Sequence, residues 1–189
     1  MKKLFLIIGA PGSGKTTDAE LIASNNENIT HYSTGDMLRA EVASKSKLGK
    51  EIENYISKGL IVPINIAITT ITNAIKNAPT DVVILDGYPR SIEQMDALEK
   101  LLKNNSNIIL TNIIEVKVSE ETARDRVLGR ARGADDNDEV FNNRMKVYLE
   151  PLDEIRTFYK TKDIYKVISG EGTIEDIVSE METYIKSKL

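Results

Sequence analysis

Residues 9–16 have the spacing of a phosphate-binding loop: a glycine, any four residues, a glycine, a lysine, and then a serine or threonine. Glycines let the backbone turn so that successive N–H groups point at one anion. Lys15 adds a positive charge, and the helix expected to follow presents the positive end of its dipole. Thr16 or Thr17 would offer a hydroxyl to Mg²⁺. The motif indicates a nucleoside triphosphate with Mg²⁺ and leaves the phosphate acceptor open.

The arginines form a second group of residues that could bind an anion. The chain has eight, and five of them fall within 21 residues: Arg124, Arg126, Arg130, Arg132 and Arg144. Arg126 and Arg130 are four residues apart on one helical face, so both can reach one site. We expect Arg124 to lie on a solvated helix surface. The cluster predicts a local anion site in an otherwise acidic chain.

Composition limits the class of protein. The chain has 189 residues, 41% hydrophobic and 29% charged, which suits one globular domain and excludes a disordered, collagenous or membrane-bundle protein. Its 25 Lys and Arg against 29 Asp and Glu give a net charge of -4, which argues against a nucleic-acid partner. The absence of Cys excludes disulfides and a Cys-rich zinc site.

The amino-terminal apolar run, residues 4–10, is at the lower limit for an export signal and leads into the glycine-rich loop, so we interpret it as a buried strand. No stretch approaches the ~18 apolar residues of a membrane helix. We therefore expect a soluble, cytoplasmic protein with no membrane partner.

Apolar runs without alternation predict strands covered on both faces, in a parallel sheet, at residues 4–8, 82–85, 108–114 and 164–168. Segments with helical spacing lie between or after them, at residues 18–23, 92–102, 120–128, 139–159 and 174–185. The alternation predicts an open α/β sheet with right-handed crossovers.

Two insertions are expected at the carboxyl edge of this sheet, where ligands of such folds bind. One is helical, from about residue 36 to 77, and its Gly49, Gly59 and Pro63 are interpreted as turns between short helices. The other is the polar stretch 129–137, which has few apolar residues to bury.

Three further motifs accompany the phosphate-binding loop: Ser-Thr-Gly-Asp-Met-Leu-Arg at 33–39, Leu-Asp-Gly-Tyr-Pro-Arg at 85–90 with Gln94, and Asp-Arg-Val-Leu-Gly-Arg at 125–130. In this order and spacing the four motifs closely resemble the adenylate kinases, within the nucleoside monophosphate kinase family, over essentially the whole chain. The resemblance implies a P-loop NTPase fold with a five-stranded parallel sheet flanked by helices. It implies one domain over 1–189 with two mobile inserts, a helical monophosphate-binding insert at about 33–62 and a short lid at about 130–136.

The implied reaction is reversible, Mg²⁺-dependent phosphoryl transfer from ATP to AMP, giving two ADP, by a monomer. ATP is expected to bind Gly12, Ser13, Gly14, Lys15, Thr16, Thr17, Arg126, Arg130 and Gly172. AMP is expected to bind Thr34, Arg39, Leu60, Ile61, Val62, Gly87, Tyr88, Pro89, Arg90, Gln94, Arg132 and Arg144. The expected catalytic residues are Lys15, Arg90, Arg126, Arg130, Arg132 and Arg144. Mg²⁺ would contact Thr16 or Thr17 directly and Asp86 through water, with no zinc site.

The residue types agree with these roles. Arg39 and Arg90 can each grip a phosphate with two parallel hydrogen bonds, which Lys cannot do. Gln94 offers a donor and an acceptor and can pair bidentately with adenine. Phosphoryl transfer itself needs positioning and charge compensation more than covalent chemistry, so converging arginines suit it.

The chain departs from the family pattern in places. Arg130 and Arg132 are separated by one residue, so the lid is short, and Arg132 is displaced by one position from the usual Gly-Arg-x-Asp-Asp. Thr16 stands where the family often has Gly. The adjacent acidic pair, Asp135 and Asp136, either holds the arginines by ion pairs or is an acidic turn.

His31, the single histidine, is expected to be structural or exposed, because the reaction needs no proton shuttle. Two alternatives remain. A uridylate or cytidylate kinase of the same family is the nearer one, although Gln94 favours AMP since those enzymes usually carry Asn there. The other is a phosphate-loop ATP-binding regulatory protein without kinase activity, which would have no need of Arg39 and Arg90.

Overall fold

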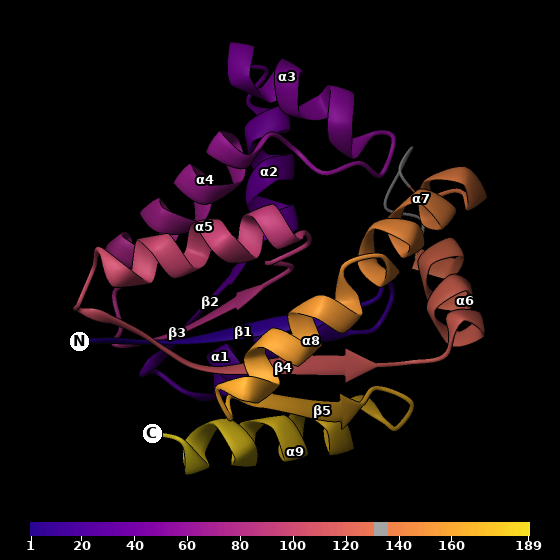
Figure 1. The fold of residues 1–189 in the computed structure, drawn as a ribbon. Helices are drawn as coiled ribbons and strands as arrows, with labels where there is room; N and C mark the ends of the chain where they lie inside the picture. Colours follow the sequence, from indigo (N-terminus) through magenta and orange to yellow (C-terminus); the bar gives the residue numbers. More distant parts are fainter. Residues whose placement is uncertain (131–135) are drawn as a thin grey trace.

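The computed structural model describes residues 1–130 and 136–189, and the expected lid residues 131–135, with Arg132 and Asp135, lie outside this part. Within the described residues, five parallel strands form one sheet in the order β2-β3-β1-β4-β5 (Figure 1). The strands are β1 (Lys2–Gly9), β2 (Ile29–Ser33), β3 (Val82–Asp86), β4 (Ile108–Lys117) and β5 (Tyr165–Ser169). The predicted α/β class and five-stranded sheet are confirmed.

Helices connect the strands and extend beyond them. They are α1 (Lys15–Asn25), α2 (Thr34–Ala43), α3 (Lys47–Ile56), α4 (Ile64–Asn77), α5 (Ile92–Lys103), α6 (Glu120–Arg130), α7 (Asp138–Leu149), α8 (Leu152–Thr161) and α9 (Ile174–Ser187). In the part of the chain that the structure describes, no helix is both long enough and apolar enough to span a membrane.

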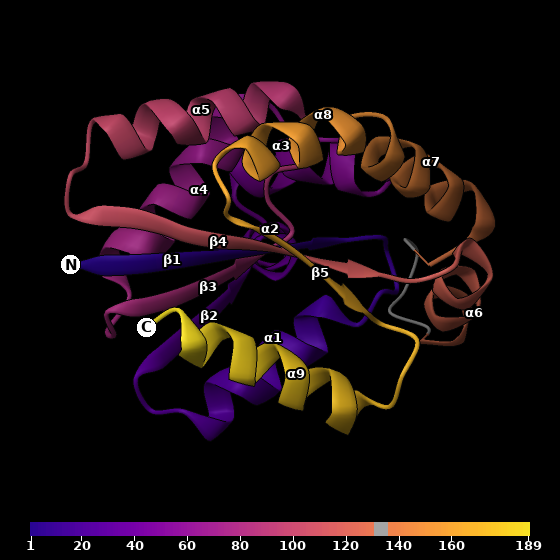
Figure 2. The same cartoon turned by 60° about the horizontal axis from the view of Figure 1, so that its bottom comes forward.

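The apolar runs become strands because both faces of the sheet are covered. Figures 1 and 2 show α4, α5 and α8 over one face and α1 and α9 over the other. Alternate residues of β1 divide between the two layers: Leu4, Leu6 and Ile8 pack toward α5 and α8, whereas Phe5 and Ile7 pack toward α1 and α9. Burial on both sides removes the alternation of polar and apolar residues that a half-exposed strand would show.

The carboxyl edge of the sheet is where the connecting segments gather. α6 and α7 lie beyond this edge and bury Val127, Phe141 and Met145 against Ala10 of the phosphate-binding loop. The hydrophobic contacts therefore attach the arginine-bearing helices directly to the loop.

Three details of the predicted elements were wrong or missing. The helix expected at 139–159 is two helices, because Pro151 lacks an N–H and interrupts the segment between α7 and α8. Gly49 lies inside α3 rather than in a turn, and a Cβ there would stand 2.3 Å from the carbonyl oxygen of Glu41 in α2. β2 was not predicted from apolar runs, because its central residues are polar and half-buried at the edge of the sheet.

Candidate active site

The phosphate-binding loop joins β1 to α1 and has the backbone conformation that its glycines allow. Gly12 and Gly14 have positive φ angles of 79° and 92°, in the region that side chains with a Cβ rarely adopt. A Cβ on Gly12 would also lie 2.4 Å from the carbonyl oxygen of Ala123 in α6. The loop can therefore be closed against α6 only with glycine at this position.

Lys15 is the first residue of α1 and carries a perturbed ammonium group. Burial lowers the pKa of Lys15 from 10.5 to about 8, and the carboxylate of Asp86 opposes this shift. Three guanidinium groups also contribute to this lowering of the pKa, those of Arg90, Arg130 and Arg144. A polyanion bound here would be favoured because it relieves the repulsion among these cations.

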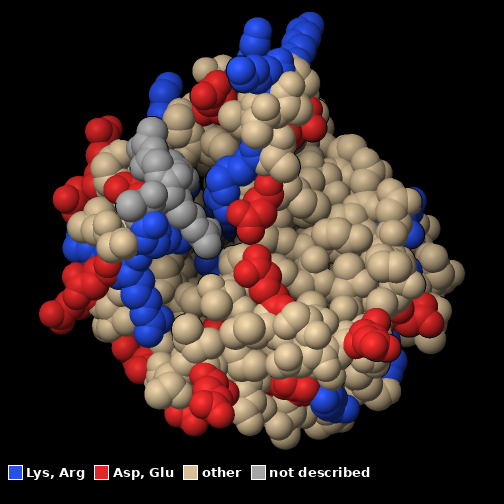
Figure 3. Space-filling view, turned by 180° about the vertical axis from the view of Figure 1, so that it is seen from behind, with Lys and Arg blue, Asp and Glu red and all other residues tan. Residues whose placement is uncertain are grey.

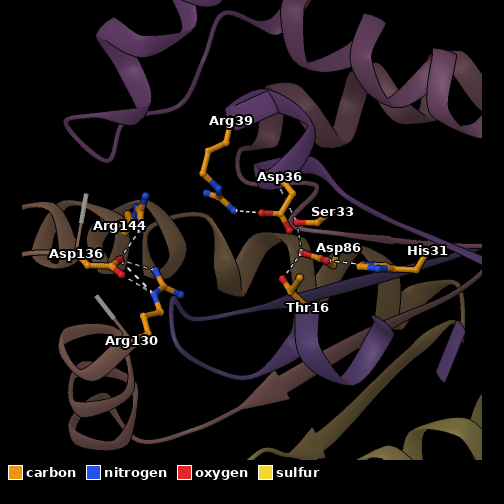
Figure 4. A network of polar contacts seen from close by, with 9 residues as sticks. All are labelled: Thr16, His31, Ser33, Asp36, Arg39, Asp86, Arg130, Asp136 and Arg144. Atoms are coloured by element: carbon orange, nitrogen blue, oxygen red, sulfur yellow. Dashed lines mark hydrogen bonds and ion pairs between the residues drawn. The ribbon is translucent and has the colours of Figure 1, made fainter. Parts of the chain in front are cut away.

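Asp86, at the carboxyl end of β3, is the centre of a buried polar group (Figure 4). Its Oδ1 accepts hydrogen bonds from the hydroxyls of Thr16 at 3.1 Å and Ser33 at 3.4 Å, and its Oδ2 lies 2.7 Å from Nε2 of His31. The register that pairs Ser33 with Asp86 across β2 and β3 brings these residues together. The carboxylate is thus held from three sides.

The two isolated arginines approach the same space from different elements. Arg39 of α2 forms an ion pair with Asp36 at 2.6 Å. Arg90 follows β3, and its Nε donates to the carbonyl oxygen of Gly87 at 2.8 Å. Burial, and then the neighbouring Arg144, lowers the pKa of Arg90 to about 10, so its guanidinium group remains charged at neutral pH.

Arg130 and Arg144 meet at a carboxylate. Asp136 accepts from Nε and Nη2 of Arg130, with the shortest distance 2.8 Å, and its Oδ1 lies 3.9 Å from Nη1 of Arg144. The side chain of Asp136 is only 1% exposed. Figure 4 shows both guanidinium groups converging on it. Of the two expected outcomes for the acidic pair, ion pairing with the arginines is confirmed for Asp136.

Two cavities among the described residues meet at the phosphate-binding loop. The first, here called the large cleft, has about 1090 Å³ of empty space open to solvent, and its cationic lining residues are Lys15, Arg39, Arg90, Arg130 and Arg144. The second, the loop cavity, has about 990 Å³ and lies between the loop, Arg126 and the start of α9. Figure 3 shows Lys and Arg side chains gathered in and beside a hollow of the surface.

The structure brings the residues predicted for ATP together. All of them line the loop cavity: Gly12, Ser13, Gly14, Lys15, Thr16, Thr17, Arg126, Arg130 and Gly172. Arg126 donates from Nη2 to the carbonyl oxygen of Gly170 at 3.0 Å. Arg124, in contrast, pairs with Glu120 and Asp138 and lies over the ring of Phe141, away from both linings.

The residues predicted for AMP divide into two groups. Arg39, Leu60, Gly87, Pro89, Arg90 and Arg144 line the large cleft. Thr34, Ile61, Val62, Tyr88 and Gln94 are described but do not line it, and Arg132 lies outside the described residues. Gln94 is buried, and its Oε1 accepts a hydrogen bond from the backbone N–H of Arg90 at 2.7 Å. The amide therefore fixes the backbone of Arg90.

The sequence did not reveal the partner of one side chain at this site and missed another side chain. His31 is structural, as expected, but its contact with Asp86 follows only from the pairing of β2 with β3. Asp18 was not singled out. It lines the loop cavity while only 2% exposed, and burial raises its pKa to about 6 against the opposing charges of Arg126 and Lys15.

Comparison with known proteins agrees with this geometry. A family model described as adenylate kinase matches residues 7–164. The chain belongs to the adenylate kinase family. Similar proteins named adenylate kinase come from Wolinella succinogenes (67% identical over 190 residues), Campylobacter lari (65% over 189) and Helicobacter hepaticus (64% over 190), and each match covers 100% of both chains. The predicted family and phosphotransferase class are confirmed over the pyrimidine kinase and the non-enzymatic alternatives.

Proposed function

We propose that the chain transfers the terminal phosphoryl group of ATP reversibly to AMP, giving two ADP. The observation that carries this proposal is that Lys15, Thr16 and Arg130 line both cavities. A triphosphate in the loop cavity and a monophosphate in the large cleft would meet at these residues. Adjacent anionic substrates need such shared cations, because phosphoryl transfer depends on positioning and charge compensation.

In this proposal the loop cavity holds the donor, ATP, and the large cleft holds the acceptor, AMP. Arg126 and Arg130 grip the triphosphate, while Arg39, Arg90 and Arg144 grip the acceptor phosphate from three sides of the cleft. The segment 33–62 serves as the monophosphate-binding insert, and 130–136, with Arg132, serves as the short lid. Guanidinium groups suit these tasks because their planar forks match phosphate oxygens.

The family's dependence on Mg²⁺ fits residues beside the loop. Mg²⁺ prefers oxygen ligands and commonly binds through one or two protein groups plus substrate phosphates. Thr16 is the better placed of the two hydroxyls, because it already donates to Asp86, whereas Thr17 is exposed in the loop cavity. When bound, the ion compensates phosphate charge. Thr16 and Asp86 would hold it, Asp86 through water, with His31 and Ser33 fixing the carboxylate.

Gln94 would read the base of the acceptor. Its carbonyl oxygen already accepts one hydrogen bond from Arg90, which leaves its NH₂ group and one lone pair for a nucleobase edge. That pairing suits adenine, which presents a donor and an acceptor side by side. We further propose a cytoplasmic monomer, as the family resemblance implies. A mass near the 21.1 kDa of one chain in light scattering would support the monomer.

A coupled assay of ADP formation with AMP, CMP, UMP and GMP tests the acceptor. We expect AMP to be used best, and faster turnover of CMP or UMP would overturn the assignment. Arg90→Ala should reduce kcat/KM by orders of magnitude while leaving ATP binding largely intact, since Arg90 lines only the large cleft. A bisubstrate mimic, two adenosines joined by five phosphates, should bind tightly because it spans both cavities. Failure to bind it would contradict the proposed two-site arrangement.

A further inference from the structure

The loop cavity contains a carboxyl group to which the proposed reaction assigns no task. Asp18 lies in the first turn of α1, lines the loop cavity and is only 2% exposed. A carboxylate next to a triphosphate site is unexpected, because it repels the phosphates. A carboxylate in this position needs a hydrogen-bond donor, either from the protein or from a bound ligand.

One oxygen of this carboxylate has no hydrogen-bond partner among the described residues. Oδ2 of Asp18 is buried and accepts no hydrogen bond from any residue that the structure describes. The two nearby cations direct their hydrogen bonds elsewhere: Lys15 to the carbonyl oxygen of Ala10, and Arg126 to that of Gly170. A buried acceptor without a hydrogen bond is energetically costly, so a ligand group that donates a hydrogen bond to it would be bound favourably.

The carboxylate lies close to Gly14 of the phosphate-binding loop, in a cavity that α9 also lines. A Cβ built on Gly14 would stand 3.3 Å from Oδ2 and 3.7 Å from Oδ1 of Asp18, so the group rests against the α-carbon of Gly14. The same cavity is also lined by Gly172, Ile174 and Ile177. Apolar side chains suit a nucleoside rather than phosphates, so the cavity that Asp18 lines offers surface for the nucleoside of the donor as well as for its phosphates.

We propose that Asp18 determines the specificity for the phosphate donor, its carboxylate accepting a hydrogen bond from the donor's nucleoside. The groups of that chemistry are the 6-amino group of adenine and the ribose hydroxyls. This inference rests on the proposed function, which places ATP in the loop cavity. A hydrogen bond to a charged acceptor contributes about 10- to 100-fold in affinity, so its loss is measurable.

The experiment compares kcat/KM for ATP, inosine triphosphate, 2′-deoxy-ATP and 3′-deoxy-ATP, with AMP as acceptor. Inosine replaces the 6-amino group by a carbonyl oxygen, and each deoxy analogue lacks one hydroxyl. The wild type should use one analogue about 10- to 100-fold less well than ATP. Asp18→Ala should reduce that preference to near unity. A preference that Asp18→Ala leaves unchanged, or equal use of all four donors by the wild type, would overturn the proposal.

Asp18→Asn keeps the size of the side chain and separates the two sources. Its NH₂ group can donate to the carbonyl oxygen of inosine. If the 6-amino group of adenine is the partner of Asp18, kcat/KM for inosine triphosphate should therefore rise relative to that for ATP. If a hydroxyl is the partner, the amide oxygen still accepts it, and the preference should persist in part. If kcat/KM fell by the same factor for all four donors in both variants, Asp18 would have a merely structural role, which would contradict the proposal.

Glu175→Gln is the matched control. Glu175 is exposed in the first turn of α9, next to Ile174 of the cavity lining, so the variant removes a nearby charge without touching the cavity. Its donor preference should equal that of the wild type. Equilibrium binding of the four donors without AMP distinguishes a failure of the proposed function from a failure of the proposed role of Asp18. Selective binding that depends on Asp18 but leads to no phosphoryl transfer would refute the proposed function alone, whereas transfer without that dependence would refute this inference alone.

Discussion

Glu115 and Asp136 are both buried carboxylates that hold arginines, yet they serve different parts of the molecule. The side chain of each is 1% exposed. Glu115, in β4, accepts from Arg156 of α8 at 3.0 Å, from Tyr148 at 3.0 Å and from Tyr165 at 2.5 Å. Its oxygens are shared among α7, α8 and β5, so the group ties the sheet to its covering helices. We call it the Glu115 cluster.

The Asp136 cluster, formed with Arg130 and Arg144, differs in where its cations lie. Both arginines line the large cleft, and Arg130 also lines the loop cavity, whereas Arg156 lines neither. A phosphate carries more charge than one carboxylate and could replace Asp136 at the same guanidinium groups. The comparison teaches that two buried ion pairs of the same chemistry can differ in whether their cations face a cavity. The chemistry of the pair alone does not decide this.

The largest effect should come from a change within the Asp136 cluster. Arg130→Lys keeps the charge but loses the planar fork, so kcat should fall by about 10²- to 10³-fold, as for loss of one preorganised donor. The matched control is Arg124→Lys on the same helix, whose partners are Glu120 and Asp138. Steady-state kinetics should show the control within about twofold of the wild type. A similar loss in both variants would remove the distinction between the clusters.

In the Glu115 cluster the expected effect is on stability. Glu115→Gln leaves Arg156 without its charge partner, and breaking a buried pair costs about 3–5 kcal/mol. Since Arg156 is 26% exposed, we expect about 2 kcal/mol in the free energy of unfolding, or a fall in Tm of about 4–8 °C. Thermal and urea unfolding measure it. Well below the new Tm, kcat should stay within about threefold of the wild type, and an unchanged Tm would contradict the structural role.

The same cluster predicts a dependence of stability on pH. Burial alone would raise the pKa of Glu115, but hydrogen bonds from Arg156, Tyr165 and Tyr148 outweigh it and hold the pKa below its ordinary value of 4.5. A depressed pKa stabilises the fold above the unfolded value, and this contribution disappears as pH falls through the folded value. The difference in unfolding free energy between wild type and Glu115→Gln should therefore narrow below pH 4.5. A difference in unfolding free energy that stays constant from pH 7 to pH 3 would contradict a stabilising role of the ionised Glu115 carboxylate.

The smallest effect is expected from Asp136→Asn. Removing the carboxylate frees Arg130 and Arg144 for phosphate, so the KM for ATP should fall by up to about fivefold, equivalent to about 1 kcal/mol. Stability should change by no more than the value of about 2 kcal/mol expected for Glu115→Gln, because Arg130 and Arg156 are similarly exposed, at 28% and 26%. Kinetics and thermal unfolding on the same preparation test both statements. A rise in KM would show that Asp136 positions the arginines for phosphate instead of competing with it.

The sequence by itself determined the parts of the molecule whose geometry is local. Residues 9–16 form the phosphate-binding loop because contiguous glycines, a lysine and a following helix need no distant partner. The strands that carry it were predicted because burial on both faces leaves continuous apolar runs. The residue types of Arg39, Arg90 and Arg130 likewise indicated phosphate chemistry before any fold was considered.

Only the tertiary structure decided which distant side chains meet. His31 and Asp86 are 55 residues apart, and their contact depends on β2, an edge strand that was not predicted because it has no continuous apolar run. Pro151 divides a helix that periodicity alone would continue, and the side chain of Gln94 accepts a hydrogen bond from the backbone of Arg90. Asp18 became significant only once its burial and its unpartnered oxygen were known. Spacing along a chain fixes local backbone geometry, whereas burial and the pairing of charges arise only when separate segments pack against one another.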